Sequence, residues 1–149
     1  MRRLLLATIM LLSLSARAAD APFIALSVAD LGRSLTWYRD HLGFSVYSQG
    51  EVKERGIRFA LLKKDAALLE LLQLPAAQPR TGQGNVAQAS LTHGFFKAGM
   101  VVDDLDGLYQ SLKSQGVPIA IELGKPAGGP YRVFGVYDPE GNLLQFFGK

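Results

Sequence analysis

The chain has 149 residues, 48% of them hydrophobic, which favours one domain with a core and excludes disordered and collagen-like proteins. The formal net charge is +3, but residues 1–18 include Arg2, Arg3 and Arg17 and no acidic residue. Removing these three from the 16 basic residues leaves 13, against 13 acidic residues. Such a balanced chain has little attraction for phosphate backbones, so no nucleic acid partner is expected. The absence of cysteine excludes disulfides, zinc–thiolate sites and a catalytic thiol.

The first 18 residues have the pattern of a secretory signal peptide. Arg2 and Arg3 supply the positive start, residues 4–14 form an apolar run, and Ala-Arg-Ala at residues 16–18 is an A-x-A cleavage site. The apolar run is shorter than the roughly 20 residues that span a bilayer. We therefore expect an exported, periplasmic or secreted protein whose mature chain, residues 19–149, is a single domain without a stable membrane anchor.

The mature chain contains an internal repeat. Residues 23–31 and 97–105 each form an apolar run that ends in Asp-Leu, at an offset of 74 residues. Leu-Leu-Glu-Leu at residues 68–71 returns as Leu-Leu-Gln-Phe at residues 143–146, at an offset of 75. An offset that persists across half of the chain indicates two copies of one supersecondary unit.

The first copy, about residues 22–74, is predicted to be a βαβββ unit. Its single helix is bounded by Asp30, which can accept a backbone hydrogen bond as N-cap, and by Gly43, which can end the helix. The expected elements are a strand at 23–28, a helix at 31–42, and strands at 44–48, 56–63 and 67–72.

The second copy, about residues 91–148, follows a linker at residues 75–90 that is rich in Gln, Gly, Ala and Pro. Asp103, Asp104 and Asp106 surround the start of its helix, where carboxylates favour the positive end of the helix dipole. The expected elements are a strand at 96–102, a helix at 105–114 that ends at Gly116, and strands at 117–122, 131–137 and 143–147, the last two joined by the turn Asp-Pro-Glu-Gly-Asn at 138–142.

Two βαβββ modules, an Asp-Leu pair after each first strand and Asp-Pro-Glu-Gly-Asn before the last strand resemble the vicinal oxygen chelate superfamily, which includes glyoxalases, bleomycin resistance proteins and dioxygenases. The resemblance spans about residues 22–148. It implies an α+β fold in which the two modules form one curved mixed sheet around a cup. It also implies a divalent metal, held in the family by the strand-opening residue and the last-strand residue of each module.

Carried onto this chain, the four metal positions are Phe23, Glu70, Lys97 and Gln145. Phe23 cannot bind a metal, and Lys97 would bring a cation to the place of the metal ion. The remaining two oxygen ligands are too few for a tight divalent site, so no metal and no cofactor are expected. We expect Lys97 to substitute for the metal and to pair with Glu70 inside the cup, because a buried carboxylate needs a partner.

Other side chains have a structural interpretation beside a functional one. Arg132 and the matching Arg58 either clamp an anionic ligand or point outward from their strands. His41 and His93 are the only histidines, and neither stands at a metal position. The glycine-rich segment 124–129 runs into a strand and not into a helix, so it is interpreted as a rim of the cup and not as a phosphate-binding loop.

The first hypothesis for function is an exported, metal-free domain that binds a small, partly apolar molecule, with Phe23, Glu70, Lys97, Gln145 and Arg132 as its ligand-binding residues. One alternative is a metal-dependent enzyme of the glyoxalase, epimerase or dioxygenase type, with a divalent cofactor. Another is a metal-free acid–base enzyme in which Glu70 is catalytic. A third is a partner-binding role, because domains of this family often pair through their sheet edges, as in a homodimer.

Overall fold

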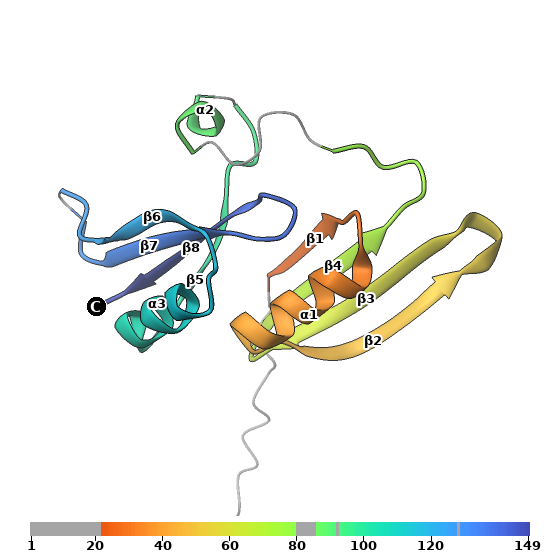
Figure 1. The fold of residues 1–149 in the computed structure, drawn as a ribbon, viewed down its shortest axis with the longest axis horizontal. Helices are drawn as coiled ribbons and strands as arrows, with labels where there is room; N and C mark the ends of the chain where they lie inside the picture. The colour runs from red at the N-terminus through yellow and green to blue at the C-terminus, as the bar shows by residue number, and fades with distance from the viewer. Residues whose placement is uncertain (1–21, 80–85, 92, 128) are drawn as a thin grey trace, which may run out of the picture.

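The structure is a computed structural model that describes residues 22–79, 86–91, 93–127 and 129–149 (Figure 1). The predicted signal peptide at residues 1–18 lies outside the described residues. In the described part of the chain, no helix has the length and apolar character needed to cross a bilayer.

Module one contains one helix and four strands, as predicted. Its sheet has the order β1-β4-β3-β2, in which β1 and β4 are parallel and the other neighbours are antiparallel. The elements are β1 (Phe23–Ser27), α1 (Leu31–Leu42), β2 (Ser45–Val52), the short 3-10 helix η1 (Lys53–Arg55), β3 (Ile57–Lys64) and β4 (Ala67–Gln73).

Local signals fix both ends of α1 at the predicted residues. The Asp30 carboxylate accepts a hydrogen bond from the Arg33 N–H, and Gly43 ends the helix in the left-handed region at φ 69°. The side chains that this helix buries are Leu31, Ser34, Tyr38 and Leu42. This stripe at helical spacing places one face of α1 against the sheet.

The strand β2 runs four residues beyond its predicted end at Ser48. The extension contains Gly50, which is a poor strand former by itself. The Phe59 ring on β3 covers this glycine, since a Cβ added at Gly50 would lie 2.7 Å from the ring. A cross-strand aromatic side chain therefore supports the extension, a contact that the local sequence does not encode.

Module two repeats the arrangement, with the sheet order β5-β8-β7-β6. Its helix begins and ends as predicted, and Asp104 caps it by accepting the Gly107 N–H. The elements are β5 (Ala98–Val101), α3 (Leu105–Ser114), β6 (Ile119–Gly124), β7 (Arg132–Tyr137) and β8 (Leu143–Gly148).

The segment between the modules differs from a plain linker. It contains a short helix, α2 (Val86–Ser90), built from helix-compatible residues that include two alanines. The Gln, Gly, Ala and Pro content of residues 75–90 predicted a linker but gave no sign of this helix.

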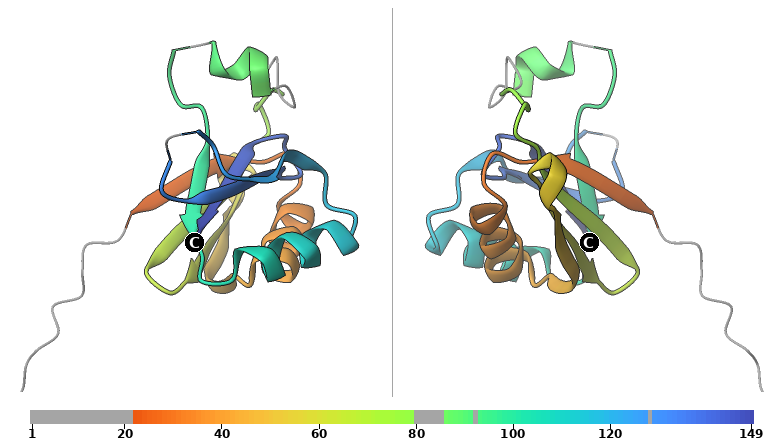
Figure 2. Two further views of the ribbon diagram at one scale, coloured as in Figure 1. Left: turned by 90° about the vertical axis from the view of Figure 1, so that its left-hand side faces the viewer. Right: turned by 90° about the vertical axis from the view of Figure 1, so that its right-hand side faces the viewer.

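The two βαβββ modules confirm the predicted α+β fold class. The eight strands form two four-stranded sheets, not one hydrogen-bonded sheet, because β1 and β5 each pair with a single neighbour. Each module therefore has a first strand with a free backbone edge on the side that faces the other module (Figures 1 and 2).

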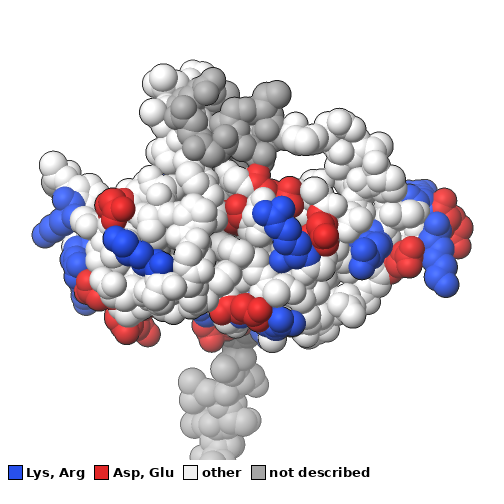
Figure 3. All heavy atoms as spheres, in the orientation of Figure 1, with Lys and Arg blue, Asp and Glu red and all other residues white. Residues whose placement is uncertain are grey.

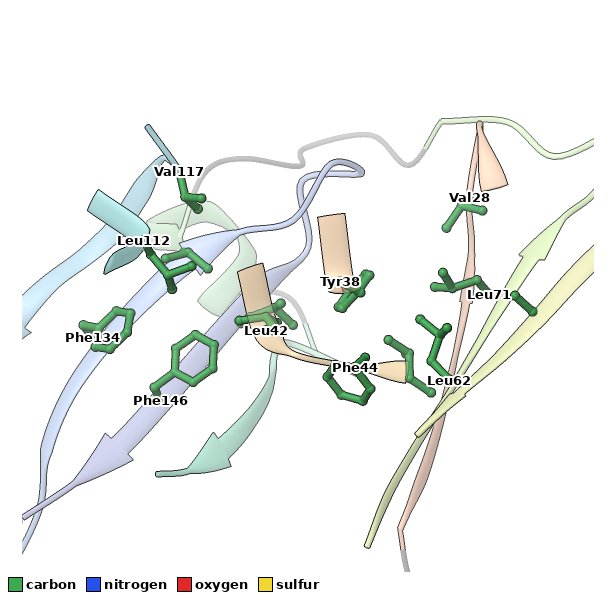
Figure 4. Close-up of a cluster of buried hydrophobic side chains, with 14 of the residues drawn as sticks. Val28, Tyr38, Leu42, Phe44, Leu62, Leu71, Leu112, Val117, Phe134 and Phe146 are labelled. Atoms are coloured by element: carbon green, nitrogen blue, oxygen red, sulfur yellow. The ribbon is translucent and has the colours of Figure 1, made fainter. Parts of the chain in front are cut away.

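One hydrophobic core joins the modules through their helices. Helices α1 and α3 approach each other at their C-terminal ends, and buried side chains from both modules form a continuous cluster. Figure 4 shows Leu42, the last residue of α1, between Phe146 of β8 and Phe44, which lies just before β2. The two modules therefore share one hydrophobic cluster.

A hydrogen bond joins equivalent positions of the two helices. The Nδ1–H of His41 donates to Oε1 of Gln115 at 2.5 Å. These residues are 74 positions apart, the same offset that relates the two repeats. When two equivalent positions touch, they lie next to the axis that relates the copies, so the helices meet around a pseudo-twofold axis.

Candidate functional site

Each sheet has one face against its helix and one face turned away, which we call its open face. In β4, Leu69 and Leu71 are buried on the helix side, so the alternating side chain of Glu70 lies on the open face. Strand register places Ala25 of β1 and Leu61 of β3 beside Glu70. This carboxylate is half-buried among apolar neighbours.

Gln145 occupies the equivalent place in module two. It lies between Gly99 of β5 and Gly135 of β7, on the open face. The residue is only 6% exposed, and its Oε1 has no hydrogen-bond donor in the described part of the structure. An enclosed carbonyl oxygen without a donor costs about 1–3 kcal/mol, which is unusual in a purely structural position.

The predicted ion pair between Lys97 and Glu70 does not form. The described residues make three ion pairs, and neither side chain takes part in any of them. Lys97 precedes β5 and is exposed, and its Nζ lies 5.3 Å from the centroid of the Phe96 ring. An exposed ammonium keeps its hydration and has little to gain from a single fixed partner, so Lys97 does not take the place of a metal.

Arg132 lies on the opposite side of the sheet from Gln145. Its two terminal nitrogens donate to both carboxylate oxygens of Asp106 on α3, at 2.7 and 2.8 Å. These hydrogen bonds lower the pKa of the Asp106 carboxyl below its ordinary value. Arg132 is therefore engaged with the helix and does not act on the open face as a ligand clamp, which corrects its assignment as a ligand-binding residue.

The side chains at the family's metal positions do not fit a divalent ion. Phe23 offers no donor atom, Lys97 carries a positive charge, and only Glu70 and Gln145 retain oxygen donors. Among the described residues, no three His, Cys, Asp or Glu side chains are grouped as a metal site would require. Glu70 and Gln145 are only two ligands, whereas a tight site needs three or four from the protein.

A pocket of about 530 Å³ lies along β1, between the two modules. Residues 23–29 form one wall, and Phe95, Glu140 and Asn142 of module two form part of the other; Ala77, Gln78 and Pro79 complete the lining. Of the predicted ligand-binding residues, only Phe23 lines this pocket. Its volume falls in the range of sites that hold small molecules.

A buried carboxylate fixes the turn that borders this pocket. Asp138 is 5% exposed, and its Oδ1 accepts the backbone N–H groups of Glu140 and Asn142 at 2.9 and 2.8 Å. Its Oδ2 accepts the Tyr38 hydroxyl of α1 at 2.7 Å and the side-chain amide of Asn142 at 2.9 Å. The turn of module two is therefore attached to the helix of module one.

The same turn places Glu140 in the pocket. Its Oε1 accepts the N–H of Ala29, just beyond β1, at 3.2 Å. Sequence reasoning interpreted residues 138–142 only as a hairpin turn and so missed both Glu140 and the Tyr38–Asp138 contact. The only available signal was the run of polar side chains in that turn, because a contact across 100 positions leaves no local pattern.

The buried hydroxyl of Tyr38 should make the protein less stable at alkaline pH. Burial raises the pKa of its hydroxyl well above the ordinary value of 10, and Asp138 raises it further. The unfolded chain ionises this tyrosine near pH 10 while the folded chain does not, so unfolding releases a proton. Stability is complete below about pH 10 and falls above it by about 1.4 kcal/mol per pH unit.

Tyr38→Phe should remove this pH dependence. In urea titrations between about pH 9 and 11, the unfolding free energy of the unmodified protein should fall more steeply than that of the variant. Parallel curves for the two proteins would show that this hydroxyl ionises equally in both states.

A sequence profile of the Glyoxalase/Bleomycin resistance protein/Dioxygenase superfamily matches residues 21–146. The chain belongs to this superfamily, as the resemblance of its two modules implied. No curated protein sequence matches the chain.

Solved structures share the fold at low identity. The glyoxalase family protein from Enterococcus faecalis is 18% identical, with a TM-score of 0.69 over 86% of this chain and 94% of that chain. SMU.1112c is 21% identical, with a TM-score of 0.67 over 84% and 95% of the respective chains. Glyoxalase I from Zea mays is also 21% identical, with a TM-score of 0.67 over 84% of this chain but only 43% of its own. These likenesses concern the fold alone.

Proposed function

We propose that this chain is an exported domain that binds a small molecule in the pocket between its modules, without the metal of its family. The observation that carries the proposal is the pocket of about 530 Å³ along β1, which both modules line. Export is supported by the signal-peptide pattern of residues 1–18. On the face that Figure 3 shows, basic and acidic side chains are interspersed, so this face offers no continuous basic surface to a phosphate backbone.

The donor set argues against a metal-dependent glyoxalase, epimerase or dioxygenase reaction. Such chemistry needs a firmly held cation that polarises substrate oxygens, and Glu70 with Gln145 supplies too few ligands. Acid–base catalysis by Glu70 lacks a second positioned group, because no described side chain hydrogen-bonds to its carboxylate. Binding without chemistry requires neither feature.

Metal content and ligand response test the proposal together. Elemental analysis of the purified mature protein, incubated with nickel, manganese, zinc or iron and then dialysed, should find no stoichiometric metal. A thermal-shift screen of small molecules should find compounds that raise the melting temperature. One tightly held divalent ion per chain would overturn the metal-free assignment, and a screen without any stabilising compound would overturn the binding assignment.

The Gln145 side chain should lower the stability of the fold, because its enclosed Oε1 has no hydrogen-bond donor among the described residues. Gln145→Met keeps the length of the side chain and removes the enclosed oxygen, so the free energy of unfolding should rise by about 1 kcal/mol in urea titrations. Gln73→Met is the matched control on β4. The Gln73 oxygen accepts the Leu31 N–H at 2.9 Å, so this substitution should instead lower stability by about 1 kcal/mol.

If both substitutions lower stability equally, the Gln145 amide has a full set of partners in solution. The Gln145 side chain would then stabilise the fold as Gln73 does.

A further inference from the structure

One wall of the pocket is a continuous strand at the edge of its sheet. Residues 23–29 all line the pocket, and this run contains no charged residue and no proline. In the described part of the chain β1 pairs only with β4, in an unbroken register, so its second edge has no neighbouring strand (Figure 1). Natural proteins usually block such an edge with charges, prolines or bulges, and β1 has none of these.

The backbone groups of β1 alternate between its two edges. The Val28 N–H donates to the Leu72 carbonyl of β4 at 2.8 Å. Even-numbered residues therefore turn their backbone groups toward β4, and odd-numbered residues turn theirs toward the free edge. The Ala29 N–H fits this alternation, because it donates at 3.2 Å to the carboxylate of Glu140, a residue of module two that lines the same pocket.

Phe23, Ala25 and Ser27 therefore each present an N–H and a C=O at the free edge. No described residue forms a hydrogen bond with these groups. The groups recur at every second residue, about 6.7 Å apart at the usual rise of a strand. A compact molecule can satisfy one such pair, whereas a second extended backbone has the same repeat and can satisfy the whole series.

We propose that the pocket binds a short, extended peptide, which adds as a strand to the free edge of β1. This assignment rests on the proposed function and names the ligand class of its pocket. Glu140 marks one end of the added strand, because its carboxylate already accepts the last free N–H of the edge, at Ala29. The Phe95 ring, 62% exposed on the module-two wall, offers apolar area to the side chains of the peptide.

Isothermal titration of the mature protein with two capped, uncharged pentapeptides tests the backbone requirement. The first probe is acetyl-Thr-Val-Thr-Val-Thr-amide. The second has the same side chains but is N-methylated at its second and third residues, so each of its edges loses one N–H and gains a methyl group. The methylated probe should bind at least about tenfold more weakly, because the hydrogen bonds of an added strand are lost on either edge.

Ser27→Pro tests the edge in the protein. Proline removes the Ser27 N–H, which faces the free edge, and leaves the hydrogen bonds to β4 in place. The variant should lose at least about tenfold in affinity for the unmethylated peptide.

Val101→Pro is the matched control. Val101 is the equivalent residue 74 positions later, on the edge strand β5, and it does not line the pocket. The next N–H, of Val102, donates to the Phe147 carbonyl as that of Val28 does to Leu72, so Val101 also faces a free edge. This variant should bind the unmethylated peptide with full affinity. Circular dichroism checks that both variants fold, and if Ser27→Pro does not fold, the methylated probe decides on the unmodified protein.

The outcomes separate this proposal from the broader one. Equal affinities for the two probes, or full affinity in a folded Ser27→Pro variant, would overturn the peptide assignment and leave small-molecule binding intact. A dimer in sedimentation velocity that Ser27→Pro dissociates would also overturn it, because a second copy of the chain would then occupy the edge. If neither probe binds while the thermal-shift screen finds stabilising compounds, only the peptide assignment fails; if the screen also finds nothing, both proposals fail.

Discussion

Asp138→Ala should lower the free energy of unfolding by about 3–5 kcal/mol, an effect comparable to breaking a buried charge network. Alanine removes the acceptor of four hydrogen bonds at once: two from backbone N–H groups of the turn, one from the Asn142 amide and one from the Tyr38 hydroxyl. Because the turn is attached to α1 through this carboxylate, the loss also loosens one module from the other. Urea titration near neutral pH measures the effect.

Tyr38→Phe removes only one of the four hydrogen bonds at Asp138 and serves as the comparison for Asp138→Ala. It removes one donor and leaves three on the carboxylate, so it should cost only about 1 kcal/mol at neutral pH. If Asp138→Ala costs no more than Tyr38→Phe, the turn is held by its backbone alone and the Asp138 carboxylate adds nothing to it.

Phe146→Ala should lower the free energy of unfolding by about 3–5 kcal/mol through a cavity in the shared core. The Phe146 side chain is fully buried, and its ring stacks on that of Phe134 with centroids 4.9 Å apart. It also lies beside Leu42 of α1, so both modules lose packing (Figure 4). Denaturant titration measures the loss.

Phe147→Ala is the control for the same residue type one position further along β8. Phe147 is half-buried on the open face, where its ring meets the Tyr131 ring edge-on at 6.4 Å. Its replacement should cost about 1 kcal/mol. Equal losses at the two positions would mean that β8 has no buried side distinct from an open side.

The helices were predictable because their signals are local. Both begin after a capping aspartate and end near a glycine, and both match residues 31–42 and 105–114 at each end. The ends of strands depend on the neighbouring strands, and the observed ends differ from the predicted ones by up to four residues. β6 begins after Pro118, which has no N–H to donate to its only neighbour β7, and its Ile119 start lies two residues beyond the expected one.

The candidate site was less predictable than the fold. The repeat and the family resemblance placed Glu70 and Gln145 at equivalent positions beside the first strands, and register agrees. Whether an exposed Lys97 reaches Glu70 depends on the spacing of two separate sheets, which sequence does not encode. Glu140 was missed for the same reason, since its partner Ala29 is 111 positions away.

The contact between His41 and Gln115 shows that the two repeated modules carry different residues at equivalent positions beside their axis. In an assembly of two identical halves, whatever stands beside the axis faces another copy of itself, so a donor would face a donor. A covalently fused pair is free of that constraint, and a histidine here meets an amide. Because the modules are fused, their last hairpin turns can also differ. Module two has the longer turn, with Glu140, so the pocket that both modules line carries, among its described residues, a carboxylate from module two alone.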